Sequence, residues 1–375
     1  MIDVALVGLA ASAFALVAFV MLTSRALRRD AEAASSAALV SHVALTEDGW
    51  RLQLDRYAGR GCPVLICHGI ATRSQNMDVH GEHSIARALH GRGHDVWLLN
   101  LRGCGRSRPN SESIAPICLD AFVRQDAPAA IAPVMRETGA AHVDWIGFSM
   151  GGIVGTAALG EPCGQHLRTM TLIGAPLRGA SSPSLGPLMR LGLALFTRRG
   201  AVPLRSLSRL GARLPRWLVW PFLRPIVNLQ NVSWRPTRLV MDQTVEDIPI
   251  ALLKQMNSWH RSSDHHAASQ DGQVDYVTRL ADAPAIPMLS ISGTGDVLGP
   301  LVATAPALRH HRGPREVRVI GQGAQSHIDR WAPEEAVSTA REHTHRWGHL
   351  DLLLSSDAPT EVFTPIGDFL ARPRS

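Results

Sequence analysis

The sequence predicts an α/β protein whose largely parallel sheet is covered by helices on both faces. In two parts of the chain, residues 38–176 and 284–375, short β-rich runs alternate with longer helical segments. Several of the short runs are apolar throughout, which is typical of strands buried on both faces. A hydrophobic content of 45% and a charged content of 19% in 375 residues indicate a sizeable core. Together these observations favour a doubly wound architecture.

The amino terminus is expected to be a membrane anchor over residues 1–29. Residues 4–22 are uncharged and long enough to cross a bilayer as a helix. Arg25, Arg28 and Arg29 follow them, whereas a secretory signal carries its positive charge before the apolar region. The positive-inside rule therefore predicts that the domain after the anchor, joined to it through a short tether, lies in the cytoplasm. A cleaved signal peptide is the alternative.

Seven segments between the tether and the carboxyl terminus are expected to be strands, and the longest helical run covers residues 122–139. The expected strands are 51–57, 63–68, 94–100, 142–148, 168–174, 287–293 and 315–321. The alternation stops between residues 177 and 283, a stretch rich in proline, arginine and leucine. This stretch is predicted to be a helical insertion that caps the domain formed by residues 38–176 and 284–375.

Basic charge is concentrated in one part of the chain. Residues 162–241 contain twelve arginines and no acidic residue, so this part carries +12 while the whole chain carries +6. Such a surface suits anionic lipid or an acidic ligand, and no nucleic-acid recognition motif accompanies it. The alternative is a general preference for arginine, since Lys254 is the only lysine. The five cysteines show no C-x-x-C spacing and signal neither a zinc site nor a disulfide framework.

A candidate nucleophile ends one expected strand and opens a helix. The segment "WIGFSMGG" contains Gly147, Ser149 and Gly151 in a G-x-S-x-G pattern. This pattern places the serine on a sharp strand-to-helix turn, where small neighbours let other backbone pass closely. The helix amino terminus adds a positive dipole end for a developing negative charge. An ordinary serine in a glycine-rich turn is the alternative.

The segment "ICHGIATRSQNMD" follows an earlier strand and is expected to supply an oxyanion hole. The backbone N–H of Ile70, together with that of Met150, would give two donors to a tetrahedral oxyanion. His68 and Gly69 precede Ile70, and His68 is interpreted as a residue that braces the loop rather than as a base. The later loop "NLRGCGRSR" lacks the third glycine of a dinucleotide site and is interpreted as structural.

The serine requires a histidine base and an acid that orients it, which follow in the order Ser, acid, His in this architecture. Asp296 lies in a glycine-rich loop after a strand, whereas Asp275 and Asp282 precede that strand. His327 and His349 then compete as the base, and spacing alone favours His327. The grouping of His343 and His345 with His349 does not match H-E-x-x-H, so no metal site is predicted, and no cofactor is expected.

The chain resembles the α/β-hydrolase fold and, more specifically, the acid (gastric and lysosomal) lipase family with its bacterial relatives. The resemblance covers residues 45–175 and 287–370, in "TEDGWRLQLDRY", "HGIATRSQNM", "GHDVWLLNLRGCGRSR", "GFSMGG", "GTGDVLGP" and "GHLDLLLSSDAPTEVF". The family's histidine precedes an A-P-x-E-V segment in an H-x-D setting, which implies His349, with Asp351 two residues later. Residues 322–346, which contain His327, depart from the family's pattern.

The sequence thus predicts a membrane-anchored serine hydrolase that cleaves esters of hydrophobic, lipid-like substrates. Ser149, Asp296 and His349 form the expected triad, and membrane lipid is the expected partner. The arginine-rich and apolar insertion is expected to lie against anionic headgroups, although an ordinary packed cap explains its tryptophans equally well. Acyl transfer, or action on a thioester or a peptide, would use the same triad. A non-catalytic membrane scaffold is the remote alternative.

Overall fold

The computed structural model describes residues 39–79, 81–110, 117–179, 185–259 and 264–372. The expected anchor, residues 1–29, lies outside the described residues. Within the described part of the chain, no helix combines the length and the apolar character needed to cross a membrane.

The main feature of the described chain is a ten-stranded sheet in the order β1-β2-β4-β3-β6-β7-β10-β11-β12, with β5 paired to β2. β1 and β2 are antiparallel to their neighbours, and every pairing from β4 to β12 is parallel. The strands are β1 (Val40–Leu45), β2 (Trp50–Tyr57), β3 (Pro63–Cys67), β4 (Asp95–Leu99), β5 (Arg108–Pro109), β6 (Val143–Phe148), β7 (Leu167–Ile173), β10 (Met288–Gly293), β11 (Arg315–Ile320) and β12 (Val337–Arg341). β3, β4, β6 and β10 are buried along their whole length, which is typical of strands covered on both faces.

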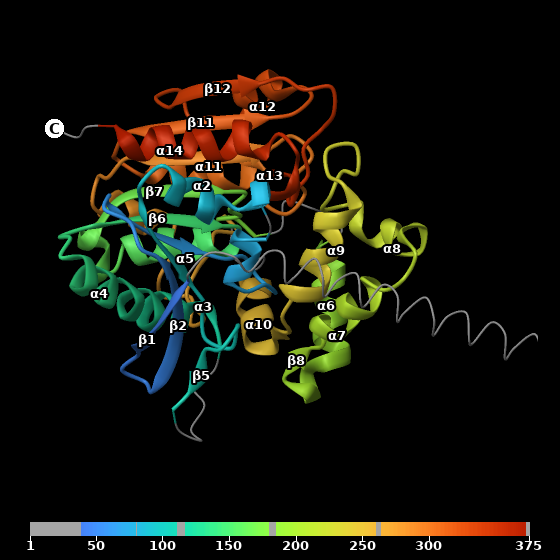
Figure 1. Ribbon diagram of the computed structural model, residues 1–375, viewed down its shortest axis with the longest axis horizontal. Coiled ribbons are helices and arrows are strands. Elements are labelled where there is room, and N and C mark those ends of the chain that lie inside the picture. Colours follow the sequence, from blue (N-terminus) through green and yellow to red (C-terminus); the bar gives the residue numbers. More distant parts are fainter. Residues whose placement is uncertain (1–38, 80, 111–116, 180–184, 260–263, 373–375) are drawn as a thin grey trace, which may run out of the picture.

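Helices cover both faces of this sheet, as Figure 1 shows. One core cluster joins the sheet to α4 (Ala127–Thr138), α5 (Met150–Leu159) and α11 (Leu301–His310). The other joins it to α2 (Ile85–Gly91) and α14 (Thr364–Ala371). This arrangement confirms the predicted α/β architecture, a largely parallel sheet covered by helices on both faces.

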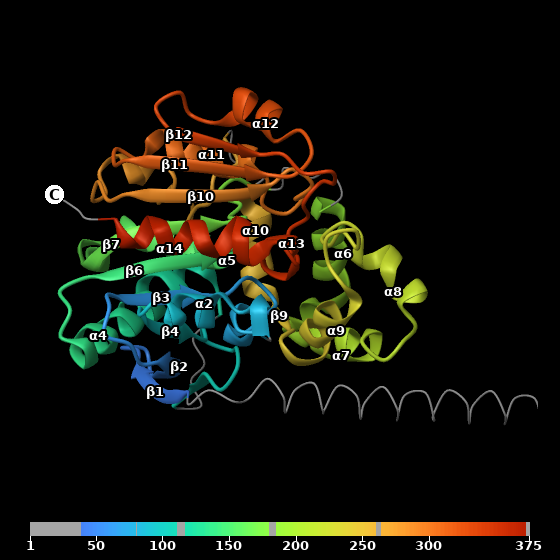
Figure 2. The same ribbon diagram turned by 45° about the horizontal axis from the view of Figure 1, so that its top comes forward.

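The predicted insertion contains a group of helices that stands beside the sheet in both views (Figures 1 and 2). A small cluster of Ala212, Val219 and Met241 packs among these helices, separate from the two large clusters. The helices are α6 (Leu185–Phe196), α7 (Leu204–Gly211), α8 (Arg216–Leu223), α9 (Trp234–Gln243) and α10 (Ile250–Ser258), and a two-stranded ribbon joins β8 (Ala201–Val202) to β9 (Ile248–Pro249).

Two elements near the carboxyl terminus lie within the segment that departs from the lipase pattern. α12 (Ala324–Trp331) and β12 follow β11, and β12 extends the sheet by one parallel strand. The chain then returns through α13 (Asp351–Leu354) to α14. This return brings residues 343–350 to the carboxyl ends of the parallel strands, where Gly295 donates a hydrogen bond to the carbonyl oxygen of Trp347 at 2.8 Å.

Candidate active site

Ser149 lies on a strained turn between β6 and α5. Its φ of 52° and ψ of −118° fall in a region that a non-glycine residue rarely adopts. The turn is held by the Ser149 N–H, which donates to the carbonyl of Ile173 at 2.8 Å. A Cβ on Gly147 would lie 2.3 Å from the carbonyl oxygen of Gly151, and a Cβ on Gly151 would lie 2.2 Å from that of Cys67. Both glycines are therefore required by close backbone contact, as the G-x-S-x-G pattern predicts.

Asp296 and His349 are hydrogen-bonded to each other beside this turn. The Nδ1 atom of His349 lies 2.8 Å from Oδ2 of Asp296, and both side chains are buried. The other carboxylate oxygen accepts the backbone N–H groups of Leu298 and Gly299, each at 2.8 Å. With both oxygens engaged, the carboxylate is held in one orientation against the imidazole ring.

Two contacts place the imidazole of His349 at the end of β6, the strand that leads to Ser149. Its ring packs on Phe148, the residue before the serine, with 4.8 Å between the ring centroids. A Cβ on Gly174, directly after β7, would lie 3.1 Å from the ring. The structure thus gathers Ser149, Asp296 and His349 at the carboxyl ends of β6, β7 and β10. The Ser149 hydroxyl makes no hydrogen bond to any described residue.

The expected oxyanion donors are both free of partners in the described chain. The N–H groups of Ile70 and Met150 donate to no other described residue. Gly69 packs closely beside the serine, since a Cβ there would lie 3.2 Å from the Cβ of Ser149. Unsatisfied N–H groups at a helix amino terminus and at a strand end can receive an anionic oxygen.

His68 is fully buried in the loop that leads to Ile70. Its Nδ1 atom lies 2.8 Å from the carbonyl oxygen of Gly69, and its Nε2 atom accepts the N–H of Leu101 at 3.2 Å. Burial lowers the pKa of His68 to about 4, against the opposing effect of the Gly69 carbonyl. The neutral ring therefore links the ends of β3 and β4, and both of its nitrogens are occupied.

The competing histidine lies elsewhere. His327 is half-buried on α12, where its Nδ1 atom lies 3.1 Å from the carbonyl oxygen of Gly323. His343 and His345 lie in the loop between β12 and α13, because the chain there pairs with the end of β11 through Gly321 and Arg346.

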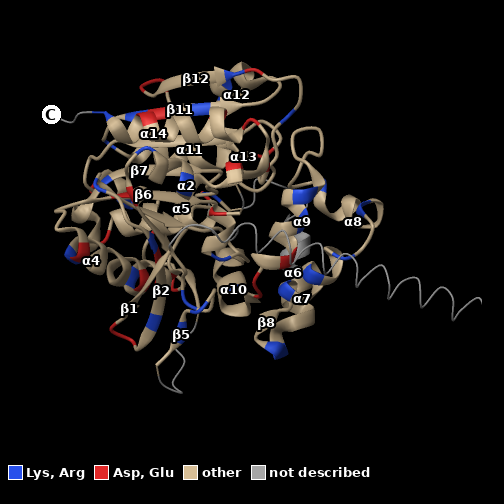
Figure 3. Ribbon diagram, viewed as in Figure 1, with Lys and Arg blue, Asp and Glu red and all other residues tan. Residues whose placement is uncertain are grey.

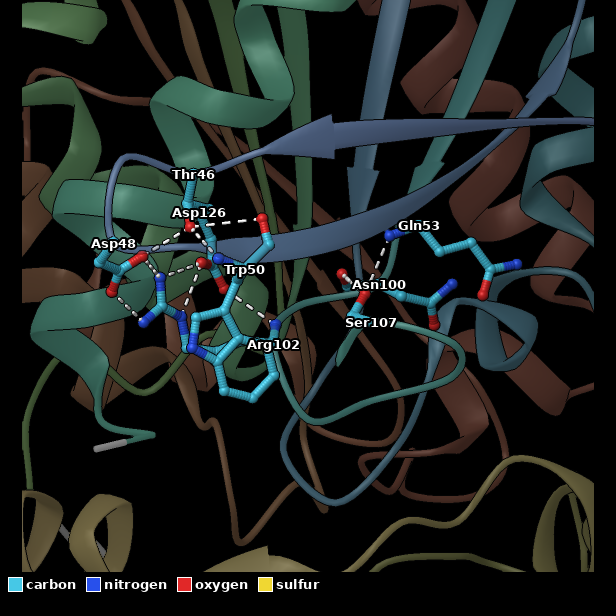
Figure 4. Close-up of polar contacts among 8 residues, drawn as sticks. All are labelled: Thr46, Asp48, Trp50, Gln53, Asn100, Arg102, Ser107 and Asp126. Atoms are coloured by element: carbon cyan, nitrogen blue, oxygen red, sulfur yellow. Dashed lines mark hydrogen bonds and ion pairs between the residues drawn. The ribbon is translucent and has the colours of Figure 1, made fainter. Parts of the chain in front are cut away.

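The arginine loop after β4 forms a buried ion-pair network, shown in Figure 4. The guanidinium of Arg102 is fully buried and contacts Asp48 at 2.6 Å and Asp126 at 2.8 Å. The Arg102 N–H also donates to Asp126, at 2.9 Å. The neighbouring Ser107 hydroxyl donates to the carbonyl of Asn100 at 2.7 Å. The network joins the β1–β2 turn, the loop after β4 and the helix that leads into α4.

Three residues of the site region carried no recognisable sequence signal. Asn228 and Asn231 of the insertion donate to the two carboxylate oxygens of Asp351, at 2.9 and 2.8 Å. Burial raises the pKa of Asp351, although these donors oppose the shift. Glu246, also buried, accepts the N–H of Gly105 at 3.2 Å and pairs with Arg205. The contacts with Asp351 and Gly105 join residues more than one hundred positions apart, and the pair with Arg205 joins Glu246 to a helix of the insertion. No local sequence pattern therefore reveals these contacts.

Comparison with known proteins identifies the fold family of the chain. The family model described as the alpha/beta hydrolase fold matches residues 63–329, which is more than half of the chain. The chain therefore belongs to the α/β-hydrolase fold family.

Within that family the chain is similar to lipases. It is 33% identical to human lipase member K over 122 residues, which cover 28% of this chain and 31% of that protein. It is 28% identical to human gastric triacylglycerol lipase over 130 residues, covering 30% and 33% respectively. The match thus spans about a third of the length of these relatives. The predicted resemblance to a lipase-like family is confirmed.

Solved structures share the fold across most of the chain. An esterase from Exiguobacterium antarcticum aligns with a TM-score of 0.55 at 14% identity, covering 89% of this chain and all of that one. A membrane phospholipase A aligns with a TM-score of 0.56 at 15% identity, covering 99% and 98%. At these identities the similarity establishes the fold alone.

Proposed function

We propose that this protein is a serine hydrolase that cleaves carboxylic esters of hydrophobic, lipid-like substrates through an acyl-enzyme. The observation that carries the proposal is the hydrogen bond between Asp296 and His349 beside the strained turn of Ser149. The carboxylate of Asp296 favours a proton on Nδ1 of His349 and leaves the Nε2 lone pair of His349 available as a base. The lipases among the relatives support the choice of ester substrates.

The proposed reaction begins when the hydroxyl oxygen of Ser149 attacks the ester carbonyl and its proton passes to Nε2 of His349. The carbonyl oxygen becomes an oxyanion that accepts the N–H groups of Ile70 and Met150. The C–O bond then breaks, and the leaving alcohol takes the proton from His349. Water attacks the acyl-enzyme with His349 again as the base, which releases the acid and regenerates Ser149.

Membrane lipid is the proposed partner, and the exposed side chains of the insertion support this. We call the cap face the set of exposed apolar side chains on α6, α7 and α8: Leu191, Leu195, Leu207, Leu210, Trp217, Leu218 and Phe222. Trp217 is 72% and Phe222 80% exposed. Exposed arginines lie among them, at positions 198, 199, 209, 216 and 224. Figure 3 shows basic residues on α7 and α8. Exposed apolar side chains together with arginines are suited to contact with an anionic bilayer.

The proposed anchor over residues 1–29 and the cap face would act together on the cytoplasmic side of a membrane. Single signals give weak, reversible membrane binding, whereas two signals give stable attachment. In this arrangement the cap face receives substrate from the bilayer, and the anchor keeps the domain at its surface.

A panel of p-nitrophenyl esters of increasing acyl length tests the chemistry, with the Ser149→Ala variant as the reference. We expect hydrolysis that increases with chain length in the wild type and background rates in the variant. A fluorophosphonate probe should label the wild type only. Activity that survives in the variant would rule out the mechanism, and product analysis with added alcohol separates hydrolysis from acyl transfer.

Sedimentation with vesicles tests the membrane partner. A Trp217→Ser/Phe222→Ser variant without residues 1–29 should bind phosphatidylserine vesicles on the order of tenfold or more weakly than the same chain with Trp217 and Phe222 intact. The Val43→Ser variant, also without residues 1–29, is the matched control, because Val43 is exposed on the edge strand β1. Equal binding by all three truncated chains would show that the cap face does not contact lipid.

A further inference from the structure

The insertion is joined by hydrogen bonds to both loops that flank Ser149. Residues 226–231 contact the loop that carries His349, and residues 244–246 contact the loop that carries Ile70. We call these the His clasp and the oxyanion clasp. Both lie in the described chain, on the segments that precede and follow α9.

The His clasp holds the backbone on each side of His349. On the amino-terminal side, the carbonyl of Arg346 accepts the side-chain N–H groups of Asn228 and Asn231, at 2.9 and 2.8 Å. On the carboxyl-terminal side, the N–H of Leu350 donates to the carbonyl of Ile226 at 2.9 Å. The loop that carries the imidazole is therefore fixed at both ends by one short segment of the insertion.

Asp351 is the acceptor at the centre of this clasp. The backbone N–H of Asn228 donates to its Oδ1 atom at 2.9 Å, and Nδ2 of Asn231 donates to its Oδ2 atom at 2.8 Å. The Asp351 side chain is completely buried, so loss of either donor leaves a buried carboxylate oxygen without that partner. This cost makes the clasp specific for one arrangement of the loop.

The oxyanion clasp acts on the other side of Ser149. Thr72 pairs with Val245 in an antiparallel bridge, and Arg73 donates its N–H to the carbonyl of Thr244 at 3.0 Å. The N–H of Glu246 donates to the carbonyl of Ala71 at 2.8 Å. Ala71 has a positive φ of 56°, a conformation that costs a non-glycine residue about 1 kcal/mol. The clasp thus supports the strained residue that directly follows Ile70.

The buried carboxylate of Glu246 locks this second clasp. It accepts the N–H of Gly105 at 3.2 Å, pairs with Arg205 of α7 and lies 3.9 Å from the guanidinium of Arg73. One carboxylate therefore connects the oxyanion loop, the loop after β4 and a helix of the insertion.

We propose that the insertion positions the base and the oxyanion donor from the outside, with Asp351, Asn231 and Glu246 as positioning residues. None of them touches the reacting atoms; each fixes a loop whose neighbouring group does. The inference rests on the proposed function of Ser149, Asp296 and His349. It predicts that breaking a clasp slows the chemical step and leaves substrate binding nearly unchanged.

The His clasp is tested in the full chain with Asn231→Ala, Asp351→Asn and the reciprocal N231D/D351N double variant. In the double variant the donor and the acceptor exchange places, so the pair between the two side chains is restored in reverse, whereas the donation from position 231 to the Arg346 carbonyl is lost. Gln230→Ala is the matched control, because Gln230 lies in the same segment with an exposed side chain. Rates are measured with a short soluble ester, and active enzyme is counted by fluorophosphonate labelling.

We expect each single variant to lower kcat on the order of 10- to 100-fold with little change in KM, since small displacements of catalytic groups have effects of this size. Labelling should be slow but should reach the same endpoint as in the wild type. The double variant should recover part of the lost rate, and the control should match the wild type. A lower labelling endpoint with an unchanged rate per labelled molecule would show that the clasp only stabilises the fold, which would overturn the inference.

The oxyanion clasp is tested with Glu246→Gln, which keeps an acceptor for Gly105 but removes the charge that pairs with Arg205. We expect kcat to fall roughly tenfold or more, with an unchanged labelling endpoint. Asp247→Asn is the control, since Asp247 is the adjacent, exposed acid and asparagine keeps the oxygen that accepts the backbone N–H of Arg205. Equal rates for both variants would remove Glu246 from the proposal. Failure of the wild type to label at Ser149 would instead contradict the proposed function.

Discussion

His349 donates through Nδ1 to Asp296 across 2.8 Å, and the same carboxylate receives two backbone N–H groups on its other oxygen. Three donors around one buried carboxylate fix its plane. The imidazole is thereby held in a single orientation, with its ring against Phe148. The first two predictions concern this pair.

Replacing Asp296 by asparagine should lower kcat on the order of 10⁴-fold, the effect of the same change in a Ser-His-Asp protease. The amide can present an N–H to Nδ1 and stabilise the tautomer that cannot accept the serine proton. Steady-state rates with a soluble ester measure the loss. The exposed Asp282 provides the control, since Asp282→Asn should retain wild-type rates. A loss of less than tenfold for Asp296→Asn would remove this carboxylate from the mechanism.

Mutation distinguishes between His349 and His327, the two candidate bases in the sequence. His349→Ala should lose activity on the order of 10⁴-fold, because no other described group is bonded to Asp296 as a base. His327→Ala should stay within about threefold of the wild type, because His327 is half-buried on α12, where its ring contacts Gly323 and not Asp296. Rates per folded molecule, normalised by circular dichroism, provide the comparison. The opposite pattern would reassign the base to α12.

Arg102→Met should destabilise the protein by about 3 kcal/mol, since removing one partner of a buried ion pair leaves an uncompensated charge. The cost is limited because burial already raises the pKa of Asp126 to about 6, so this carboxyl can take up a proton when its partner is lost. Urea denaturation at pH 7 measures the change. Arg106→Met, in the same loop but exposed, should unfold at the wild-type midpoint.

His68 should make the fold sensitive to acid. Its pKa is near 6.5 in the unfolded chain and about 4 in the folded protein, so the unfolded chain binds more protons between these values. The contribution is present above pH 6.5 and is lost as the pH falls towards 4, by up to about 3 kcal/mol.

The His68→Gln variant isolates this contribution, because glutamine offers both a donor for Gly69 and an acceptor for Leu101 without titrating. Urea denaturation at pH 7 and pH 4.5 should show a smaller acid loss in the variant than in the wild type. Parallel losses in the two proteins would contradict the assignment of the acid sensitivity to His68.

The central strands could be predicted from the sequence nearly to the residue. β3, β6 and β10 lie within one residue of the expected segments, because each is a short run with many apolar and β-branched side chains that is buried throughout. β1 and β12 escaped prediction because both are edge strands with largely exposed side chains. An exposed edge strand lacks the apolar periodicity that identifies a buried one.

The site residues also differ in whether the sequence predicts them. Ser149 and Asp296 follow from local patterns at strand ends, and His349 follows from the resemblance rather than from its spacing. Asn231 and Glu246 have no such pattern, since their importance depends on contacts made across the fold. A polar residue in an irregular helical segment looks the same whether it faces solvent or a buried carboxylate.

The two clasps restrict how this insertion can be exchanged between relatives. A cap that was attached only at its ends could be replaced by another of similar length without disturbing the catalytic loops. Here the replaced part would also remove the partners of Asp351 and Ala71. Chimaeras that change substrate range should therefore retain residues 226–231 and 244–246 and vary only the helices outside them. The natural unit of substrate specificity is thus smaller than the inserted segment.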